Sequence, residues 1–315
     1  AVRAMLADCA ALNQDAETGS RVAAAGESTP RETYVQRIRE HEQQAAAALG
    51  AGQAEAYQNV VLEDCWSSTG ASGLGADQLS DLEDLREFLC TQLGWSPQFL
   101  RLRERFVQHF GDGGECRDVL EFLTEYGTHL TEALEYGERF HDEAAQRAPD
   151  SARLGVTAQV QLVGQGSDRP PQVVVNKVFE GPAWLTARFA FGDTPEHEQL
   201  RQGLRQWLQS VAGDREPVDV LFNGDCNDLQ AHPRLTERVL RWPGEALHLP
   251  EQHQLDLRQL RIQHDAEQGT LNVFDAHHRP LHLCYLGSTV PSPSWGIPYA
   301  LSILTQPYRL LRPAQ

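Results

Sequence analysis

One arginine stands inside an apolar run. Arg188 lies near the end of VVVNKVFEGPAWLTARFAF, residues 173–191, which we expect to begin as a buried strand. A core-facing strand normally excludes charge, because an unpaired buried guanidinium costs several kcal/mol. Near the bend at Gly181–Pro182, Arg188 could bind a phosphate or carboxylate through two parallel hydrogen bonds. A buried ion pair with an Asp or Glu of the helical half would leave the same pattern, so both interpretations stay open.

A second group of arginines lies in one predicted helix. Arg101 and Arg105 are four residues apart, so they share a helix face and could grip an anion together. Glu104 can neutralise part of that charge. A surface salt-bridge network is therefore the favoured interpretation of this group.

Histidines gather in the segment DAHHRPLH. On a strand, His278 and His282 would share a face, as a metal site requires, with His277 beside them. Asp275 begins a turn-like stretch, so the end of a hairpin in water is the better interpretation. We expect no metal and no other cofactor.

Several functional classes lack their motifs. The sequence has no GxGxxG after a strand, no GxxxxGK[ST], no GxSxG and no HExxH. Six cysteines are scattered without a CxxC pair, which argues against a zinc knuckle or a thioredoxin-type site. Free thiols in a reducing cytosol explain them, so we expect a cytoplasmic protein.

Charge and hydropathy narrow the choice further. Lys and Arg total 27 against 44 Asp and Glu, a formal net charge of -17, and Lys177 is the only lysine. A uniformly basic nucleic-acid surface is therefore excluded, although a local basic patch is not. No run of about 18 apolar residues occurs, so we expect no membrane span. The first 20 residues lack the apolar stretch of a secretory signal.

The elements that would position these residues change in kind along the chain. Capping residues and apolar periodicity predict helices in the first half and one later helix, at 30–50, 79–94, 96–114, 118–145 and 195–213. Ser28 or Thr29 is the expected cap of the first helix and Ser80 that of the second. Strands are predicted at 57–65, 155–164, 172–191 and 217–224 and in a hairpin over 260–287 that turns at 265–269.

This order of elements favours an α+β fold over a doubly wound nucleotide-binding fold. We expect a mainly helical lobe over residues 1–153 and a β-rich lobe over 154–315. The helical half would pack on a mostly antiparallel sheet with one inserted helix.

Four segments carry a resemblance to a known family. They are LRLRERFVQHFGDGGECRDVLEFLTEYG, VVVNKVFEGPAWLTARFAF, NDLQAHPRLTERVLRWPG and LDLRQLRIQHDAEQGTLNVFDAHHRPLHLCYLG. In this order, over roughly residues 100–290, they resemble the later part of the glutamylation region of the lantibiotic dehydratase, or LanB-type, family. The chain is also similar to small LanB-like ligases that add an amino acid to the carboxyl end of a peptide.

The resemblance implies aminoacyl-tRNA chemistry. Such enzymes esterify glutamate from glutamyl-tRNA onto Ser or Thr of a precursor peptide, with aminoacyl-tRNA as co-substrate. The late arginine of the family's glutamylation region maps onto Arg188, which is the expected catalytic residue. Asn176 is a weaker companion, and Asn176, Arg101 and Arg105 are the expected substrate or tRNA contacts.

The chain also departs from the family. The early glutamylation region, the reader of the leader peptide and the elimination domain have no visible counterpart, so we expect a partial or split subunit that works with a complementary LanB-like polypeptide. The charge of -17 agrees with a basic tRNA surface on that partner. The alternative is a noncatalytic scaffold that binds partner proteins and uses Arg188 as a structural ion pair.

Overall fold

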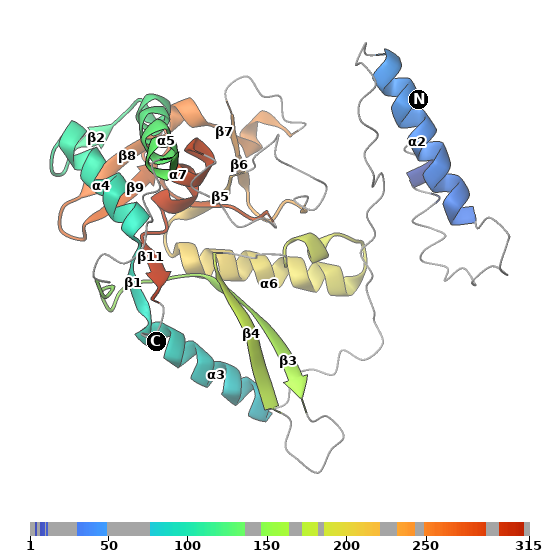
Figure 1. Cartoon of the computed structure of the whole chain (residues 1–315), viewed down its shortest axis with the longest axis horizontal. Coiled ribbons are helices and arrows are strands. Elements are labelled where there is room, and N and C mark those ends of the chain that lie inside the picture. The colour runs from blue at the N-terminus through green and yellow to red at the C-terminus, as the bar shows by residue number, and fades with distance from the viewer. Residues whose placement is uncertain are drawn as a thin grey trace. The chain divides into compact units, whose positions relative to one another are not determined.

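The structure of the chain is a computed structural model, shown in Figure 1. It describes residues 4, 7–9, 11, 30–48, 76–135, 146–163, 172–181, 186–220, 232–242, 249–287 and 296–311. The predicted strand at 57–65 lies outside the described residues. The chain divides into two compact units, Ala1–Thr69 and Gly70–Gln315. The boundary expected near residue 153 falls inside the second unit. In the described residues, no helix is long and apolar enough to cross a membrane.

The first unit contains the helix predicted there. Helix α2 spans Pro30–Ala48. Its Ile38 is 3% exposed. The buried carboxylate of Asp8 pairs with Arg37 at 2.7 Å and lies 3.3 Å from His41. The residues expected to cap this helix, Ser28 and Thr29, lie outside the described residues.

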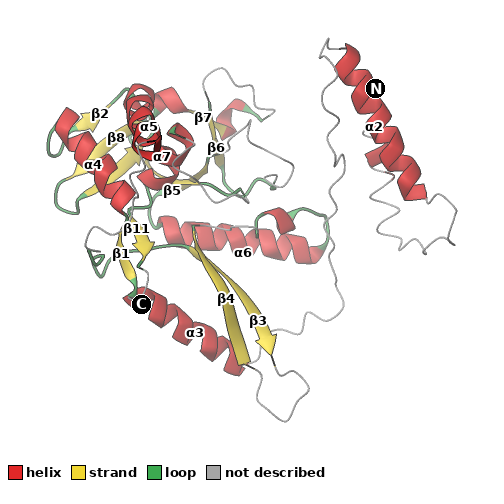
Figure 2. Cartoon of the chain, in the orientation of Figure 1, coloured by secondary structure: helices red, strands yellow, loops and turns green. Residues whose placement is uncertain are grey.

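The second unit is built around a seven-stranded sheet (Figure 2). Its order is β2-β8-β9-β10-β5-β6-β7. The neighbours from β2 to β10 are antiparallel, and those from β10 to β7 are parallel. The strands are β2 Glu115–Cys116, β5 Glu216–Asp219, β6 Arg238–Arg241, β7 Gln254–Asp256, β8 Arg261–Asp265, β9 Thr270–Phe274 and β10 Pro280–Cys284.

The α+β class is confirmed. The predicted hairpin near the end of the chain is also present. Strands β8 and β9 pair around the turn at 265–269, as predicted. The sheet is more mixed than expected, because half of its neighbouring pairs are parallel. Strand β5 follows helix α6, Pro195–Ala212, and enters the sheet parallel to β10.

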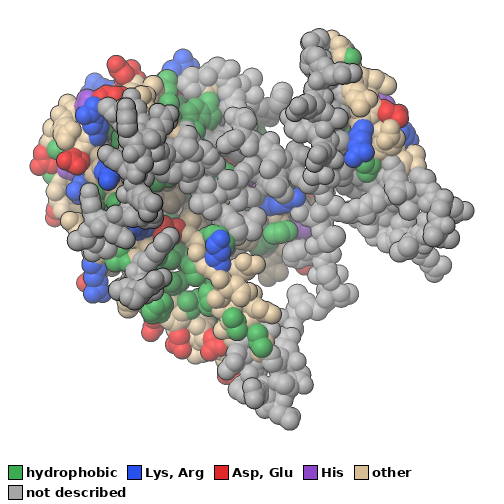
Figure 3. Space-filling model, viewed as in Figure 1, with side chains coloured by type: hydrophobic (Ala, Val, Ile, Leu, Met, Phe, Trp, Pro, Cys, Tyr) green, Lys and Arg blue, Asp and Glu red, His purple; other side chains and the backbone are tan. Residues whose placement is uncertain are grey.

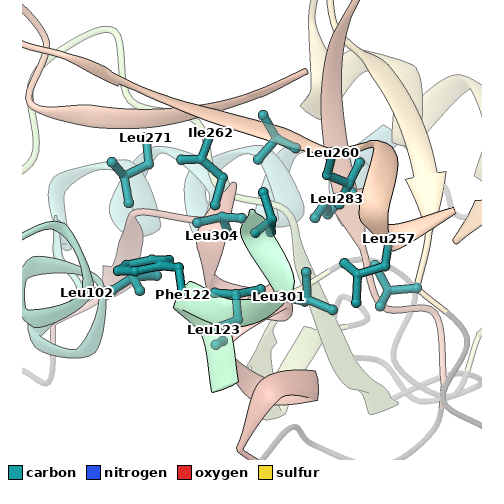
Figure 4. Packing of buried hydrophobic residues seen from close by; sticks show 14 of the residues in the cluster. Leu102, Phe122, Leu123, Leu257, Leu260, Ile262, Leu271, Leu283, Leu301 and Leu304 are labelled. Carbon is teal, nitrogen blue, oxygen red and sulfur yellow. The ribbon is translucent and has the colours of Figure 1, made fainter. Parts of the chain in front are cut away.

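Helices cover one face of the sheet and enclose the larger core. They are α4 Pro97–Phe110, α5 Val119–Glu135 and α7 Ile297–Leu304. Figure 4 shows Leu102, Phe122 and Leu304 packed toward Ile262 and Leu271 of the sheet. Each fully buried side chain of this size contributes about 1.5–3 kcal/mol. Ser96 caps α4 by accepting a hydrogen bond from the Phe99 amide, and Pro97 fits the first turn.

The strands alternate between two faces, and this separates a second, smaller core from the first. Leu281 and Leu283 of β10 belong to the larger core, whereas Cys284 belongs to a cluster that contains Leu204 and Leu208 of α6. Helix α6 therefore packs on the opposite face of the sheet from α4, α5 and α7.

The remaining described elements are short strands and a ribbon. Strands β3 Val156–Val163 and β4 Gln172–Glu180 form an antiparallel ribbon beside helix α3, Ala76–Thr91, and β1 Leu93–Trp95 pairs with β11 Tyr308–Leu310. The expected cap of α3 was wrong, because the helix begins at Ala76 and Ser80 lies inside it. The expected strand through residue 191 was also wrong: β4 ends at Glu180, and Gly181 adopts a φ of 104° that favours glycine.

Candidate functional site

Arg188 begins a short 3-10 helix, η1 Arg188–Ala190, and does not end a strand. Arg188 is 8% exposed to solvent and has at least one interaction within the chain. The adjoining Ala187 and Ala190 are buried against α6 in the smaller core. Arg188 is therefore held in place by the packing of η1 on α6. Its expected catalytic role stays a prediction.

The other predicted site residues lie on different elements. Asn176 is exposed in the middle of β4. Arg101 and Arg105 lie on α4, on the opposite face of the sheet from α6. The four residues are thus spread over three elements, and their expected roles as substrate or tRNA contacts remain predictions.

Arg105 of the arginine pair on α4 has a counterion on another helix. Arg105 Nη2 lies 2.5 Å from Glu125 Oε1 of α5, and His109 Nε2 lies 3.2 Å from the other oxygen of that carboxylate. Glu104, the expected neutralising residue, is exposed and its carboxylate is not the one that binds Arg105. Arg105 therefore joins two helices, which favours the salt-bridge interpretation of this residue.

The smaller core brings together three of the four family-like segments. Ala187 and Ala190 come from the ARFAF segment, Leu235 from the HPRL segment, and Cys284 and Leu286 from the end of the hairpin. These segments are separated by about a hundred residues of sequence between Ala187 and Leu286. Tertiary packing thus places Ala187 and Ala190, which flank Arg188, in the same apolar cluster as two other segments of the resemblance.

A buried acid and imidazole lie beside this cluster. Asp219 ends β5, and the parallel register places it opposite Cys284, the last residue of β10. Asp219 Oδ2 lies 3.4 Å from His232 Nε2, and their side chains are 2% and 3% exposed. Asp219 stands where β5 and β10 end, the kind of edge at which open α/β sheets commonly bind ligands.

The hydrogen bonds of this pair define where its protons lie. His232 Nδ1 lies 3.0 Å from the Pro233 carbonyl oxygen, which can only accept, so Nδ1 carries a proton. Burial raises the pKa of Asp219 to about 6, and the charge of His232 and the amides of Leu286 and Val220 oppose that rise. Burial therefore shifts the Asp219 carboxyl toward its protonated form compared with an exposed aspartate.

Cys284 is unsuited to act as a nucleophile. Its thiol is fully buried and donates to the Val218 carbonyl at 3.3 Å. Burial raises the pKa of the Cys284 thiol well above its usual value, and the charge of Asp219 adds to that effect. The thiol therefore stays protonated near neutrality. The four cysteines in the described residues, Cys9, Cys90, Cys116 and Cys284, are all free.

The histidine-rich hairpin end differs in part from expectation. His277 and His278 are exposed, as expected, but Asp275 is 1% exposed. Asp275 Oδ1 accepts from the amides of His277 and Arg279, so it is a buried organiser of the turn. Among the residues that the structure describes, no group of three or more His, Cys, Asp or Glu could hold a metal ion.

Sequence reasoning missed Asp219 and His232 as site residues. His232 belongs to the HPRL segment, and Asp219 is the one charged residue in the apolar stretch PVDVLF. A charge inside a strand run was the signal that singled out Arg188, and the same signal applies to Asp219. What the sequence did not reveal was the contact between two residues 13 positions apart across a strand end.

Comparison with known proteins yields structural similarity only. No protein-family model and no curated protein matches the chain. Among solved structures, it is similar to the "Glutamylation domain, TbtB, from thiomuracin biosynthesis", with a TM-score of 0.48 and 15% identity over 76% of this chain and 36% of that one. A second structure, that domain "bound to 5'-phosphodesmethylglutamycin", gives a TM-score of 0.48 and 14% identity over 75% and 35%. The chain thus spans about a third of the length of these structures.

Proposed function

We propose that this chain is part of a LanB-like enzyme of ribosomal peptide modification. In this proposal it supports transfer of an amino acid, glutamate in the first instance, from aminoacyl-tRNA to Ser or Thr of a precursor peptide. It acts in the cytoplasm, together with a complementary LanB-like polypeptide.

One observation supports this function above the others. Three of the four segments that carry the sequence resemblance meet in one apolar cluster, which includes Ala187 and Ala190 on either side of Arg188.

The reaction is a transesterification, and its demands fit this chemistry. The peptide hydroxyl attacks the carbonyl carbon of the aminoacyl ester, a new ester bond forms, and the bond to the terminal ribose oxygen of the tRNA breaks. The hydroxyl proton passes to that leaving oxygen. A fixed guanidinium such as Arg188 can hold a substrate carboxylate or phosphate during this exchange. The Asp219–His232 pair is in this proposal a positioning element at the strand ends.

A noncatalytic scaffold is the second candidate. The observation in its favour is that Arg188 is only 8% exposed and has an interaction within the chain. In this case Arg188 stabilises the packing of η1 and takes no part in transfer.

Replacing Arg188 separates the two functions. With the complementary polypeptide, charged tRNA and precursor peptide, we expect Arg188→Ala to slow the gain in peptide mass by at least about 100-fold, as loss of a key charge donor does. Arg188→Lys keeps the positive charge but not the planar guanidinium, so its rate should lie between that of the unsubstituted chain and that of Arg188→Ala. Mass spectrometry over time gives the rates.

Arg117→Ala is the matched control, because Arg117 is 73% exposed and pairs with Glu115 on β2. Thermal melting of each variant reports folding. If the Arg188→Ala protein folds and still supports the full gain in peptide mass, Arg188 has no role in transfer. The scaffold function would then be favoured over the transferase function.

The surface proposed for the complementary polypeptide is an apolar groove between α3 and the β3–β4 ribbon. The groove encloses about 230 Å³ and is lined by leucines of α3 and by Val156 and Ala158 of β3. Leu79, 55% exposed, extends the leucine row of α3. In Figure 3 hydrophobic side chains gather here, with acidic side chains along the margin of α3. An apolar partner surface with a basic rim would complement this face.

Leu79→Ser should weaken binding of the complementary polypeptide by about tenfold or more, because burial of one large apolar side chain contributes about 1.5–3 kcal/mol. Calorimetric titration measures the affinity. Phe191→Ser is the control, since Phe191 is 49% exposed near the start of α6. Equal weakening by both substitutions would argue against this surface.

A further inference from the structure

A polar cavity of about 780 Å³ lies on the α6 face of the sheet, and none of the roles proposed above accounts for it. Its walls include Arg153, Arg215, Thr270, Asn272, Thr305 and Tyr308. Arg215 precedes β5, whereas Asp219 ends it. At about 3.3 Å per residue the cavity lies roughly 13 Å from the Asp219–His232 pair along that strand.

Two guanidinium groups face this cavity without carboxylate partners. Arg215 Nε donates to the Ala212 carbonyl at 3.1 Å, and Arg153 Nη1 donates to the Ser210 carbonyl at 3.3 Å. Among the described residues, neither arginine forms an ion pair. Burial lowers the pKa of Arg215; the charge of Asp214 opposes that lowering, and the charge of Arg153 adds to it. Two like charges held this close favour an anion between them.

One nitrogen of each arginine donates a hydrogen bond to a carbonyl at the carboxyl end of α6 and so caps that helix. The carbonyls of Ser210 and Ala212 belong to the last turn of α6, where cations are favourable. Each guanidinium carries further N–H donors that make no hydrogen bond within the described part of the chain. Helix capping therefore accounts for where the two arginines stand, and leaves several donors for a ligand.

Uncharged donors complete the lining. The Tyr308 hydroxyl and the Asn272 carboxamide make no hydrogen bond with any residue that the structure describes, although Tyr308 packs its ring on Trp95. Burial raises the pKa of Tyr308, against the charge of Arg215, so its hydroxyl stays a donor. Four side chains from separate segments thus offer N–H or O–H groups to one cavity.

His282 lies beneath the same part of the sheet. It is 2% exposed, and in the described structure neither ring nitrogen has a hydrogen-bond partner. It shares a strand face with Pro280, which lines the cavity, and extending the β9–β10 register places it opposite Asn272. A buried imidazole without a partner is costly, and a negative charge at Arg215 would offset the cationic field acting on it.

The carboxylates of the cavity leave room for an anion. Asp265 Oδ1 accepts from the amides of Glu267 and Gln268 in the β8–β9 turn. Asp214 is exposed and forms no ion pair with Arg215 within the described residues. Neither carboxylate neutralises the arginines by direct contact.

We propose that this cavity is a binding site for a phosphate-bearing ligand, whose oxyanion is held by Arg153 and Arg215 and by the Tyr308 hydroxyl. Two guanidinium groups match the charge of a phosphate monoester. The cavity is larger than inorganic phosphate, and Phe274 and Tyr308 supply aromatic surface for an attached organic group. The site does not depend on the proposed transfer of an amino acid.

Titration with inorganic phosphate and with phenyl phosphate at low ionic strength tests the site. We expect saturable binding to the full chain by calorimetry, with a rise in melting temperature and a shift of the His282 ring signals in NMR spectra. Arg215→Gln should weaken binding at least tenfold. Tyr308→Phe keeps the aromatic packing, removes only the hydroxyl, and should weaken binding about three- to tenfold.

Arg117→Gln, on the distant strand β2, is the control for general charge. Tighter binding of phenyl phosphate than of inorganic phosphate would support an organic phosphate as the ligand, and equal binding would support recognition of the phosphate group. Binding that is not saturable, or that Arg117→Gln weakens as much as Arg215→Gln and Tyr308→Phe do, would overturn the proposal.

Discussion

Arg238→Met is expected to lower the free energy of unfolding by about 3–5 kcal/mol, the usual cost of removing one partner from a buried ion pair. The Arg238 side chain is 9% exposed. Its Nε and Nη2 donate to the two oxygens of Glu216, each at 2.6 Å, and its Nη1 donates to Asp275 at 3.0 Å. Methionine fills similar space but leaves two carboxylates near the core without this cation.

This cation joins three strands of the sheet. Arg238 lies on β6, Glu216 on β5, and Asp275 directly after β9. Burial opposes ionisation of Asp275, but the amides of Arg279 and His277 and the guanidinium groups of Arg279 and Arg238 keep its pKa below the usual value. Loss of Arg238 removes one of these groups and the side-chain link between the end of β9 and the parallel strands β5 and β6.

Urea denaturation at neutral pH measures the effect, with Arg258→Met as the control. Arg258 also pairs with a carboxylate, Asp256 at 2.7 Å, but its side chain is 65% exposed. Because the Arg258 guanidinium is exposed and Asp256 keeps its second cation, Arg241, we expect a much smaller loss of stability. If both variants lose a similar free energy of unfolding, the ion pairs of Arg238 contribute no more to stability than the pair of Arg258.

The second large effect concerns pH and His282. Burial lowers the pKa of His282 to about 3, and the nearby charge of Arg215 adds to that shift. The unfolded chain therefore binds one more proton than the folded chain between about pH 3 and the ordinary value near 6.5. The stability that comes from keeping His282 neutral is fully present above that ordinary value and is lost as pH falls toward 3.

His282→Leu should remove this dependence. As pH falls from about 6 to 4, we expect the variant to gain stability relative to the unsubstituted chain by about 1.4 kcal/mol per pH unit. Asp219 acts in the opposite sense, because burial raises its pKa to about 6 and favours its protonated form in the folded chain. Asp219 is present in both proteins, so its contribution cancels in the difference.

Chemical denaturation at a series of pH values gives the two stability curves. His277→Leu is the control, because His277 is exposed in the turn before the same strand. A constant difference between His282→Leu and the unsubstituted chain across pH 4–6 would mean that His282 is protonated in the folded state without cost.

Local sequence rules determined the helices and the last hairpin. Helix α4 was predicted from its apolar period, which is confirmed by the buried face with Phe99 and Leu102. The hairpin β8–β9 was predicted from alternation around a polar turn. These features arise from interactions between neighbours in sequence, so a single sequence suffices to predict them.

Pairing between distant strands was not determined in this way. Strand β5 is only four residues long, and its parallel neighbours β6 and β10 come from later segments on either side of the hairpin. The alternation of a strand shows that one face is buried, but not which strand lies beside it. Because alternation does not identify neighbouring strands, the sheet was expected to be mostly antiparallel and its parallel half was not predicted.

The sequence by itself determined the α+β class, most helices and the unusual position of Arg188 among apolar residues. Tertiary structure decided that Arg188 begins a 3-10 helix on α6, that Glu125 binds Arg105, and that Asp219 meets His232 where β5 ends. Burial and charge pairing depend on groups far apart in the chain. Their energies are therefore set by the three-dimensional packing, which no local pattern encodes.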